Sequence, residues 1–148
     1  MVWQNLLLRR VAYFDLQVLK SKLSVKIGIL FMKQSFLEKR IDGAKMIEQV
    51  CQRALSEIGS QVNQMKTDGS QNKAGNLLQE LIETLRQENV LELFFSSKLI
   101  HEQLVIKSAG VLKLLLKKQA ISDEELELLW TNCQKHISTA LELTKVLI

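Results

Sequence analysis

Two cysteines and two histidines are the residues of this 148-residue chain with the greatest capacity for chemistry. Cys133 and His136 lie three residues apart, so they would meet on one side of a helix, where a histidine can activate a thiol. Cys51 lies among regularly spaced apolar residues. A catalytic thiol needs a partly exposed position beside a positive charge or at a helix N-terminus. Neither cysteine has that position, so we predict that both are structural core residues.

No metal or cofactor site is predicted. His101-Glu102 begins like the zinc-protease helix motif, but the position of the second histidine is occupied by Val105. No other cluster of cysteines and histidines offers four zinc ligands. Gly69 and Gly75 lie in a polar segment without the lysine-serine step of a phosphate-binding loop, so nucleotide binding is not expected either.

A group of acidic residues near position 125 is explained by helix capping. Ser122 is followed three residues later by Glu125, which is the spacing of a capping box. Acidic side chains are also favoured in the first turn of a helix, where the backbone dipole is positive. We therefore interpret the acids as first-turn residues and not as an acid/base pair; they are Asp123, Glu124, Glu125 and Glu127.

The helices that must position these residues follow from composition and periodicity. The absence of proline, six glycines and 47% hydrophobic residues predict an all-α protein. Apolar residues recur every three or four positions in 3–19, 37–65, 76–85, 100–118 and 122–148, and a short apolar segment occupies 90–95. The polar segment 67–75 is predicted to be a mobile loop. We expect antiparallel helical pairs that form a fragment of an armadillo-like α-solenoid.

Residues 22–31 depart from this pattern, because apolar and polar side chains alternate there as in a β-strand. With no second strand to pair with, the segment must become helical by context, pair with another molecule or stay poorly ordered. We therefore divide the chain into an N-terminal part, 1–35, containing a helix and an ill-defined segment at 22–34, and a helical-repeat domain, 36–148.

Charge is distributed unevenly along the chain. Residues 1–40 carry a net charge of +6, whereas the chain as a whole carries +4. The basic residues do not form a compact block with interleaved aromatic residues, so nucleic-acid binding is not expected. No apolar run reaches the roughly 18 residues that span a bilayer, and two cysteines suit a cytoplasmic, intracellular protein. One functional hypothesis is a small stand-alone helical adaptor whose basic N-terminal third binds an acidic partner or a membrane surface.

A second hypothesis comes from a family resemblance carried by several short motifs in order. The motifs are the leucine-phenylalanine turn at 93–95, Ile100-His101, Ile106-Lys107-Ser108, the acidic capped turn, Leu128-Leu129-Trp130 and Gln134-Lys135-His136. LEKRIDG at 37–43, which contains Arg40, and LLQELIETLRQENVLELFF at 77–95 add to them. Together they resemble the non-catalytic helical-repeat region of the very large fat-facets-type ubiquitin-specific proteases and cover most of residues 36–148.

The resemblance implies a scaffold or interaction segment of a deubiquitinating cysteine protease, with protein partners or ubiquitinated substrates. The catalytic cysteine and histidine boxes of the family are absent around both cysteines and both histidines, so this chain alone is not expected to be an enzyme. The positions that carry the resemblance have structural or partner-binding roles, with Trp130 expected in an inter-helix core and His136 expected to cap or bridge helices; they are Arg40, His101, Trp130, Lys135 and His136.

The chain departs from the family at one place. The family pattern would run from Lys20-Ser21 directly into Ser35-Phe36-Leu37. Residues 22–34 are therefore interpreted as inserted, either as a lineage-specific insertion or as an intron that was not removed from the gene model. Exposed apolar ends of a solenoid fragment also predict that the isolated chain aggregates or dimerises.

Overall fold

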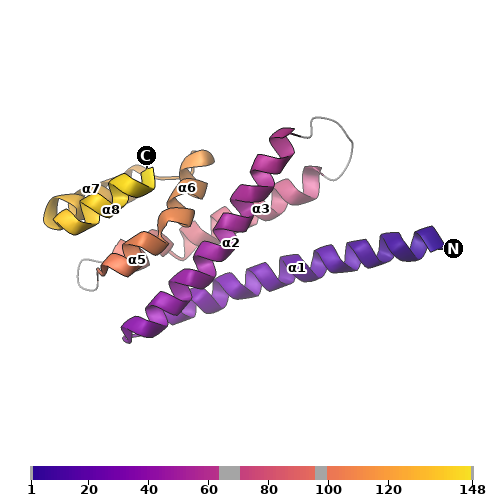
Figure 1. The fold of residues 1–148 in the computed structure, drawn as a ribbon, viewed down its shortest axis with the longest axis horizontal. Helices are drawn as coiled ribbons and strands as arrows, with labels where there is room; N and C mark the ends of the chain where they lie inside the picture. The colour runs from indigo at the N-terminus through magenta and orange to yellow at the C-terminus, as the bar shows by residue number, and fades with distance from the viewer. Residues whose placement is uncertain (1, 64–70, 96–99, 148) are drawn as a thin grey trace.

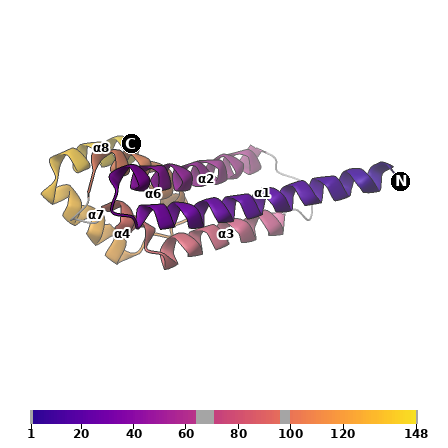
Figure 2. The ribbon, with the colours of Figure 1, turned by 90° about the horizontal axis from the view of Figure 1, so that it is seen from below.

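A computed structural model describes residues 2–63, 71–95 and 100–147 of the chain. These residues form helices throughout, with no strand, so the prediction of an all-α protein is confirmed (Figure 1). The helices are α1 (Val2–Met32), α2 (Leu37–Asn63), α3 (Gln71–Gln87), α4 (Val90–Phe95), α5 (Glu102–Lys107), α6 (Ala109–Lys117), α7 (Asp123–Lys135) and α8 (Ile137–Leu147). The N-terminus of α1 and the pair α7 and α8 lie at opposite ends of the longest axis in both views (Figures 1 and 2).

The predicted helix at 3–19 and the strand-like segment after it form one continuous helix, α1. Val25, Ile29 and Met32 follow the three-and-four spacing of a helix, and all three are buried. In a strand, Leu23 would share a face with Val25, yet Leu23 is 55% exposed. Burial of one helical face against α2 therefore outweighs the local alternation, and the segment becomes helical by context.

Two glycines set the distance between α1 and α2. A Cβ atom built on Gly28 would lie 2.8 Å from the backbone oxygen of Gly43 and 2.8 Å from Cγ1 of Ile47. A Cβ atom on Gly43 would lie 2.8 Å from Cβ of Phe31 and 2.9 Å from the backbone nitrogen of Met32. Because neither position has room for a side chain, the two helix backbones approach as closely as glycine allows. Gly43 lies inside α2, where glycine is unfavourable for a helix, and this close contact accounts for its position.

α2 agrees with the predicted helix at 37–65 over the residues described. α3 begins at Gln71, so residues 71–75, which we predicted as part of a loop, are helical; the rest of that predicted loop, 67–70, lies outside the described residues. The short helix α4 follows Asn89, whose positive φ of 49° ends the preceding helical segment. Most of α4 is buried in the core: Val90, Leu91, Phe94 and Phe95.

The predicted helix at 100–118 is two helices, α5 and α6, separated at Ser108. Ser108 is fully buried, and its Oγ donates a hydrogen bond to the backbone oxygen of Val105 at 2.6 Å. A serine that bonds back to the preceding turn in this way bends a helix. Gly110, just after the interruption, faces α2: a Cβ atom there would lie 3.2 Å from the backbone oxygen of Glu48.

The predicted helix at 122–148 is also two helices, α7 and α8. The predicted capping box is confirmed: the backbone N–H of Glu125 donates to Oγ of Ser122 at 3.3 Å, and the backbone N–H of Ser122 donates to Oε2 of Glu125 at 2.8 Å. α7 ends where His136 takes an extended conformation, with φ −132° and ψ 102°. This break turns α8 toward α5 and α6 and buries Leu143, which a straight helix would carry away from them.

The contact between α1 and α2 yields a matched pair of substitutions on α2. Gly43→Ala should lower the free energy of unfolding by about 1–3 kcal/mol, because the added methyl forces two helices apart. Gly59→Ala should instead raise it by about 0.5–1 kcal/mol, because nothing lies within 4 Å of a Cβ atom there and alanine favours the helix. Urea unfolding followed by far-UV circular dichroism measures both. Equal effects of the two substitutions would contradict the close contact.

Candidate interaction surface

Neither thiol is placed for nucleophilic chemistry. Cys51 is completely buried on α2, and burial together with the nearby Glu48 carboxylate raises its pKa to about 12. Cys133 is half-buried on α7, and burial raises the pKa of this thiol as well. His136 follows Cys133 by three residues but lies in the extended junction beyond α7. At neutral pH both side chains are therefore protonated thiols.

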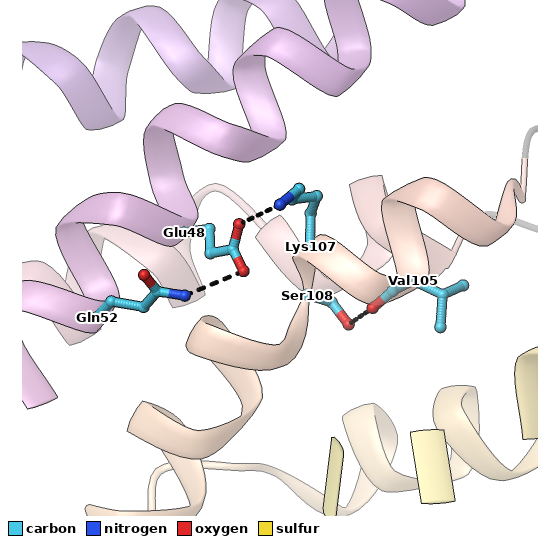
Figure 3. Close-up of polar contacts among 5 residues, drawn as sticks. All are labelled: Glu48, Gln52, Val105, Lys107 and Ser108. Atoms are coloured by element: carbon cyan, nitrogen blue, oxygen red, sulfur yellow. Dashed lines mark hydrogen bonds and ion pairs between the residues drawn. The ribbon is translucent and has the colours of Figure 1, made fainter. Parts of the chain in front are cut away.

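The most buried ion pair among the described residues joins α2 to α5 and is drawn in Figure 3. Oε2 of Glu48 lies 3.0 Å from Nζ of Lys107, and Nε2 of Gln52 donates a hydrogen bond to Oε1 of Glu48 at 3.2 Å. The side chain of Glu48 is 11% exposed, whereas that of Lys107 is 31% exposed. Both carboxylate oxygens are thus occupied by protein donors from two helices. The arrangement is that of a structural ion pair, without a free acid or base for catalysis.

Arg40 links two helices from a buried position. Its Nη2 donates a hydrogen bond to the backbone oxygen of Leu93 on α4 at 3.1 Å. Burial lowers the pKa of the guanidinium, although an arginine stays charged at any physiological pH. A charged donor to a carbonyl oxygen near a helix end is strongly stabilising, so Arg40 has a structural position.

The other positions that carry the family resemblance lie far from Arg40 along the chain, in or next to α5 and α7. Nδ1 of His101 accepts a hydrogen bond from the backbone N–H of Gln103 at 3.3 Å, which makes His101 the N-cap of α5. Lys135 is exposed in the last turn of α7. His136 is the C-cap residue of α7, and its backbone N–H donates to the oxygen of Asn132 at 3.0 Å. These positions do not assemble a catalytic site.

The expectation for Trp130 was wrong: its side chain is 63% exposed and does not form an inter-helix core. The core-facing side of α7 is formed by Leu128, Leu129 and Asn132, so Trp130 lies on the opposite side of the helix. Trp130 belongs to a row spaced by three and four residues, in which every member is exposed. We name this row the α7 face: Asp123, Leu126, Glu127, Trp130 and Gln134.

A second apolar surface runs along α1, away from its contact with α2. Leu16, Leu23 and Leu30 repeat every seven residues, and each is at least half exposed. Leu6 and Tyr13, which are also seven residues apart, lie in a second row three residues before the first, and both are exposed. Two basic side chains, Arg9 and Lys20, fall within the same heptad positions and are exposed as well. We name this surface the α1 stripe: Leu6, Arg9, Tyr13, Leu16, Lys20, Leu23 and Leu30.

Neither surface was predicted from the sequence, although each corresponds to a regular spacing of residues in it. The seven-residue repeat of the α1 stripe spans the boundary between the predicted helix and the strand-like segment, so it becomes visible only when both are one helix. On the α7 face, Trp130 was expected in an inter-helix core, because spacing alone does not say which side of a helix meets the core.

Two exclusions can be stated for the part of the chain that the structure describes. No group of three or more histidine, cysteine, aspartate or glutamate side chains there could hold a metal ion. Within the same ranges, none of the helices combines the length and the apolar content that a membrane span requires.

The ion pair between Glu48 and Lys107 can be tested by removing one partner. Lys107→Met should lower the free energy of unfolding by about 1–3 kcal/mol, because it leaves a nearly buried carboxylate without its cation. The double variant Glu48→Gln/Lys107→Met should recover part of that loss, since no charge is then left unpaired. Chemical unfolding of the single and double variants measures the coupling. Strictly additive effects would show that the two side chains do not interact.

Comparison of the chain with protein-family models, with curated proteins and with solved structures gives no significant match.

Proposed function

We propose that this chain is a non-catalytic interaction segment, built as part of an armadillo-like helical array and related to the scaffold regions of very large ubiquitin-specific proteases. The motifs over residues 36–148 support the relation to that family. The all-helical fold agrees with such an array. In this proposal the chain presents helix surfaces to protein partners or ubiquitinated substrates of the parent enzyme.

The observation that carries the interaction role is the exposure of large apolar side chains in ordered rows on α1 and α7. Scattered exposed leucines are normal on any protein. Leucines repeated every seven residues on α1, and a tryptophan one turn from a leucine on α7, instead place large exposed apolar side chains along one side of each helix. Such surface is costly to keep in water and is typical of a protein that binds a partner there.

The chemistry of the thiols supports a binding role over a catalytic one. A deubiquitinase of the cysteine class attacks the ubiquitin carbonyl with a thiolate, which a neighbouring histidine stabilises. Burial raises the pKa of Cys133 and of Cys51, and this opposes thiolate formation at both positions.

The absence of catalysis in this chain is testable with ubiquitin probes. The purified chain should form no adduct with ubiquitin that carries a thiol-reactive group at its C-terminus. Alkylation of Cys133 by a small reagent should be slow at neutral pH and accelerate toward alkaline pH, because a raised pKa moves thiolate formation upward. Cys133→Ser is the control for site assignment by mass spectrometry. A rapid ubiquitin adduct on Cys133 at neutral pH would contradict the proposal.

The family assignment needs an independent test, which long-read sequencing of the transcript provides. A reading frame that continues into the cysteine and histidine boxes of a ubiquitin-specific protease would support a scaffold segment of that enzyme. Transcripts that contain a stop codon directly after Ile148, with no such boxes elsewhere in the frame, would refute the assignment. The same reads decide whether residues 22–34 are encoded in the mature transcript.

A further inference from the structure

We propose that the α1 stripe of one copy of this chain docks on the α7 face of a second copy, so that the protein self-associates head to tail. This inference does not depend on the relation to ubiquitin-specific proteases. It follows from the shape, the spacing and the charges of two exposed surfaces that lie on one molecule.

The α1 stripe has the geometry of a helix-pairing surface. Its leucines at 16, 23 and 30 repeat every seven residues, which is the spacing that keeps apolar side chains facing a second helix. Val25 and Ile29, which contact the core, lie on the other side of α1. The stripe is therefore free along a helix whose amino-terminal end projects beyond α2 and α3 in both views (Figures 1 and 2).

The charges on the α1 stripe specify what kind of helix fits. Arg9 and Lys20 lie within the stripe, and the exposed Lys26 lies beside it. Asp15, the one acidic residue of α1, falls on another side of the helix by its position in the heptad. A complementary surface must therefore be apolar with acidic side chains next to its apolar residues.

The α7 face has this composition. Leu126 and Trp130 are one helical turn apart, and Asp123 and Glu127 flank them at three and four residues. Trp130 offers the large exposed apolar surface that often anchors a helix interface. Asp123 and Glu127 are free to meet external cations, because the ion pairs formed within the described parts of the chain involve other acids.

Geometry and charge exclude the two simpler pairings. Within one molecule the projecting, amino-terminal part of the stripe cannot meet the α7 face, because the projecting end of α1 and α7 lie at opposite ends of the long axis (Figure 1). Two α1 stripes pairing with each other would bring Arg9 and Lys20 of both copies into one interface without an acid to neutralise them. A contact between unlike surfaces is heterologous, so each copy keeps one free surface and association can continue.

The test uses two variants that each disable one surface. Leu16→Gln/Leu23→Gln removes apolar contacts from the α1 stripe, and Leu126→Gln/Trp130→Gln removes them from the α7 face. All four side chains are largely exposed, so the fold should be retained and far-UV circular dichroism checks it. Phe36→Gln is the matched control, because Phe36 is 73% exposed and lies on neither surface. Sedimentation velocity over a range of concentrations measures the association.

The wild-type chain and the Phe36→Gln control should show a mass that rises with concentration. Each double variant alone should weaken association by at least about tenfold. An equimolar mixture of the two double variants should form dimers containing one copy of each and nothing larger, because one intact stripe and one intact α7 face remain. Added salt should weaken the association, since opposite charges attract across the interface.

Three results would overturn the proposal. A wild-type chain that stays monomeric at every concentration excludes self-association, and binding of that monomer to phosphatidylserine vesicles through the stripe would assign it to membranes instead. Loss of association in the α1 variant but not in the α7 variant would indicate paired α1 stripes. A mixture of the two variants that stays monomeric would exclude a head-to-tail contact.

Charge exchange gives an answer even if a double variant fails to fold. Lys20→Glu and Glu127→Lys should each weaken association, because each places like charges in the interface. The chain carrying both substitutions should regain it, since the opposite charges are restored with their positions exchanged. Failure of the combined variant to recover any association would count against the proposal.

Discussion

The close contact between Gly28 and Gly43 is the constraint on which the arrangement of the first helices depends. It lets the backbones of α1 and α2 approach without intervening side chains, so that Val25, Ile29 and Met32 reach the core. A second close approach on α2 lies one turn and a half later, where Gly110 of α6 meets the backbone oxygen of Glu48. α2 is therefore held on two sides by small residues, and the remaining helices are positioned relative to it.

Local signals predicted the parts of this fold that local chemistry determines. The capping box at Ser122 and Glu125 formed as predicted, because its two hydrogen bonds need residues only three positions apart. α2 was predicted from its long three-and-four repeat. The interruptions at Ser108 and His136 were not, because each belongs to a part of the chain that packs against distant helices: Ser108 is completely buried, and the bend at His136 lets Leu143 enter the core. The exposure of Trp130 was not predicted either, because helical spacing does not say which side of α7 packs against the other helices.

The segment 22–34 shows how tertiary contacts decide between two local patterns. Its alternation suggests a strand, but the same residues also contain a helical row formed by Val25, Gly28 and Ile29. The segment becomes helical because Gly43, which has no side chain, lets Gly28 and its neighbours pack directly against the backbone of α2. Residues 22–34 therefore supply the α1 side of the contact with Gly43 and Ile47.

The two candidate surfaces exist because α1 and α7 each contact the other helices through only one side. α1 meets α2 near its carboxyl end through Val25, Gly28 and Ile29, whereas its exposed side carries the leucines at 16, 23 and 30 and the basic Lys20. α7 meets its neighbours through Leu128 and Leu129, so its acidic first turn and Trp130 point outward. The basic apolar stripe on α1 and the acidic apolar face on α7 are complementary in charge, and this complementarity is the basis of the contact proposed between two copies of the chain.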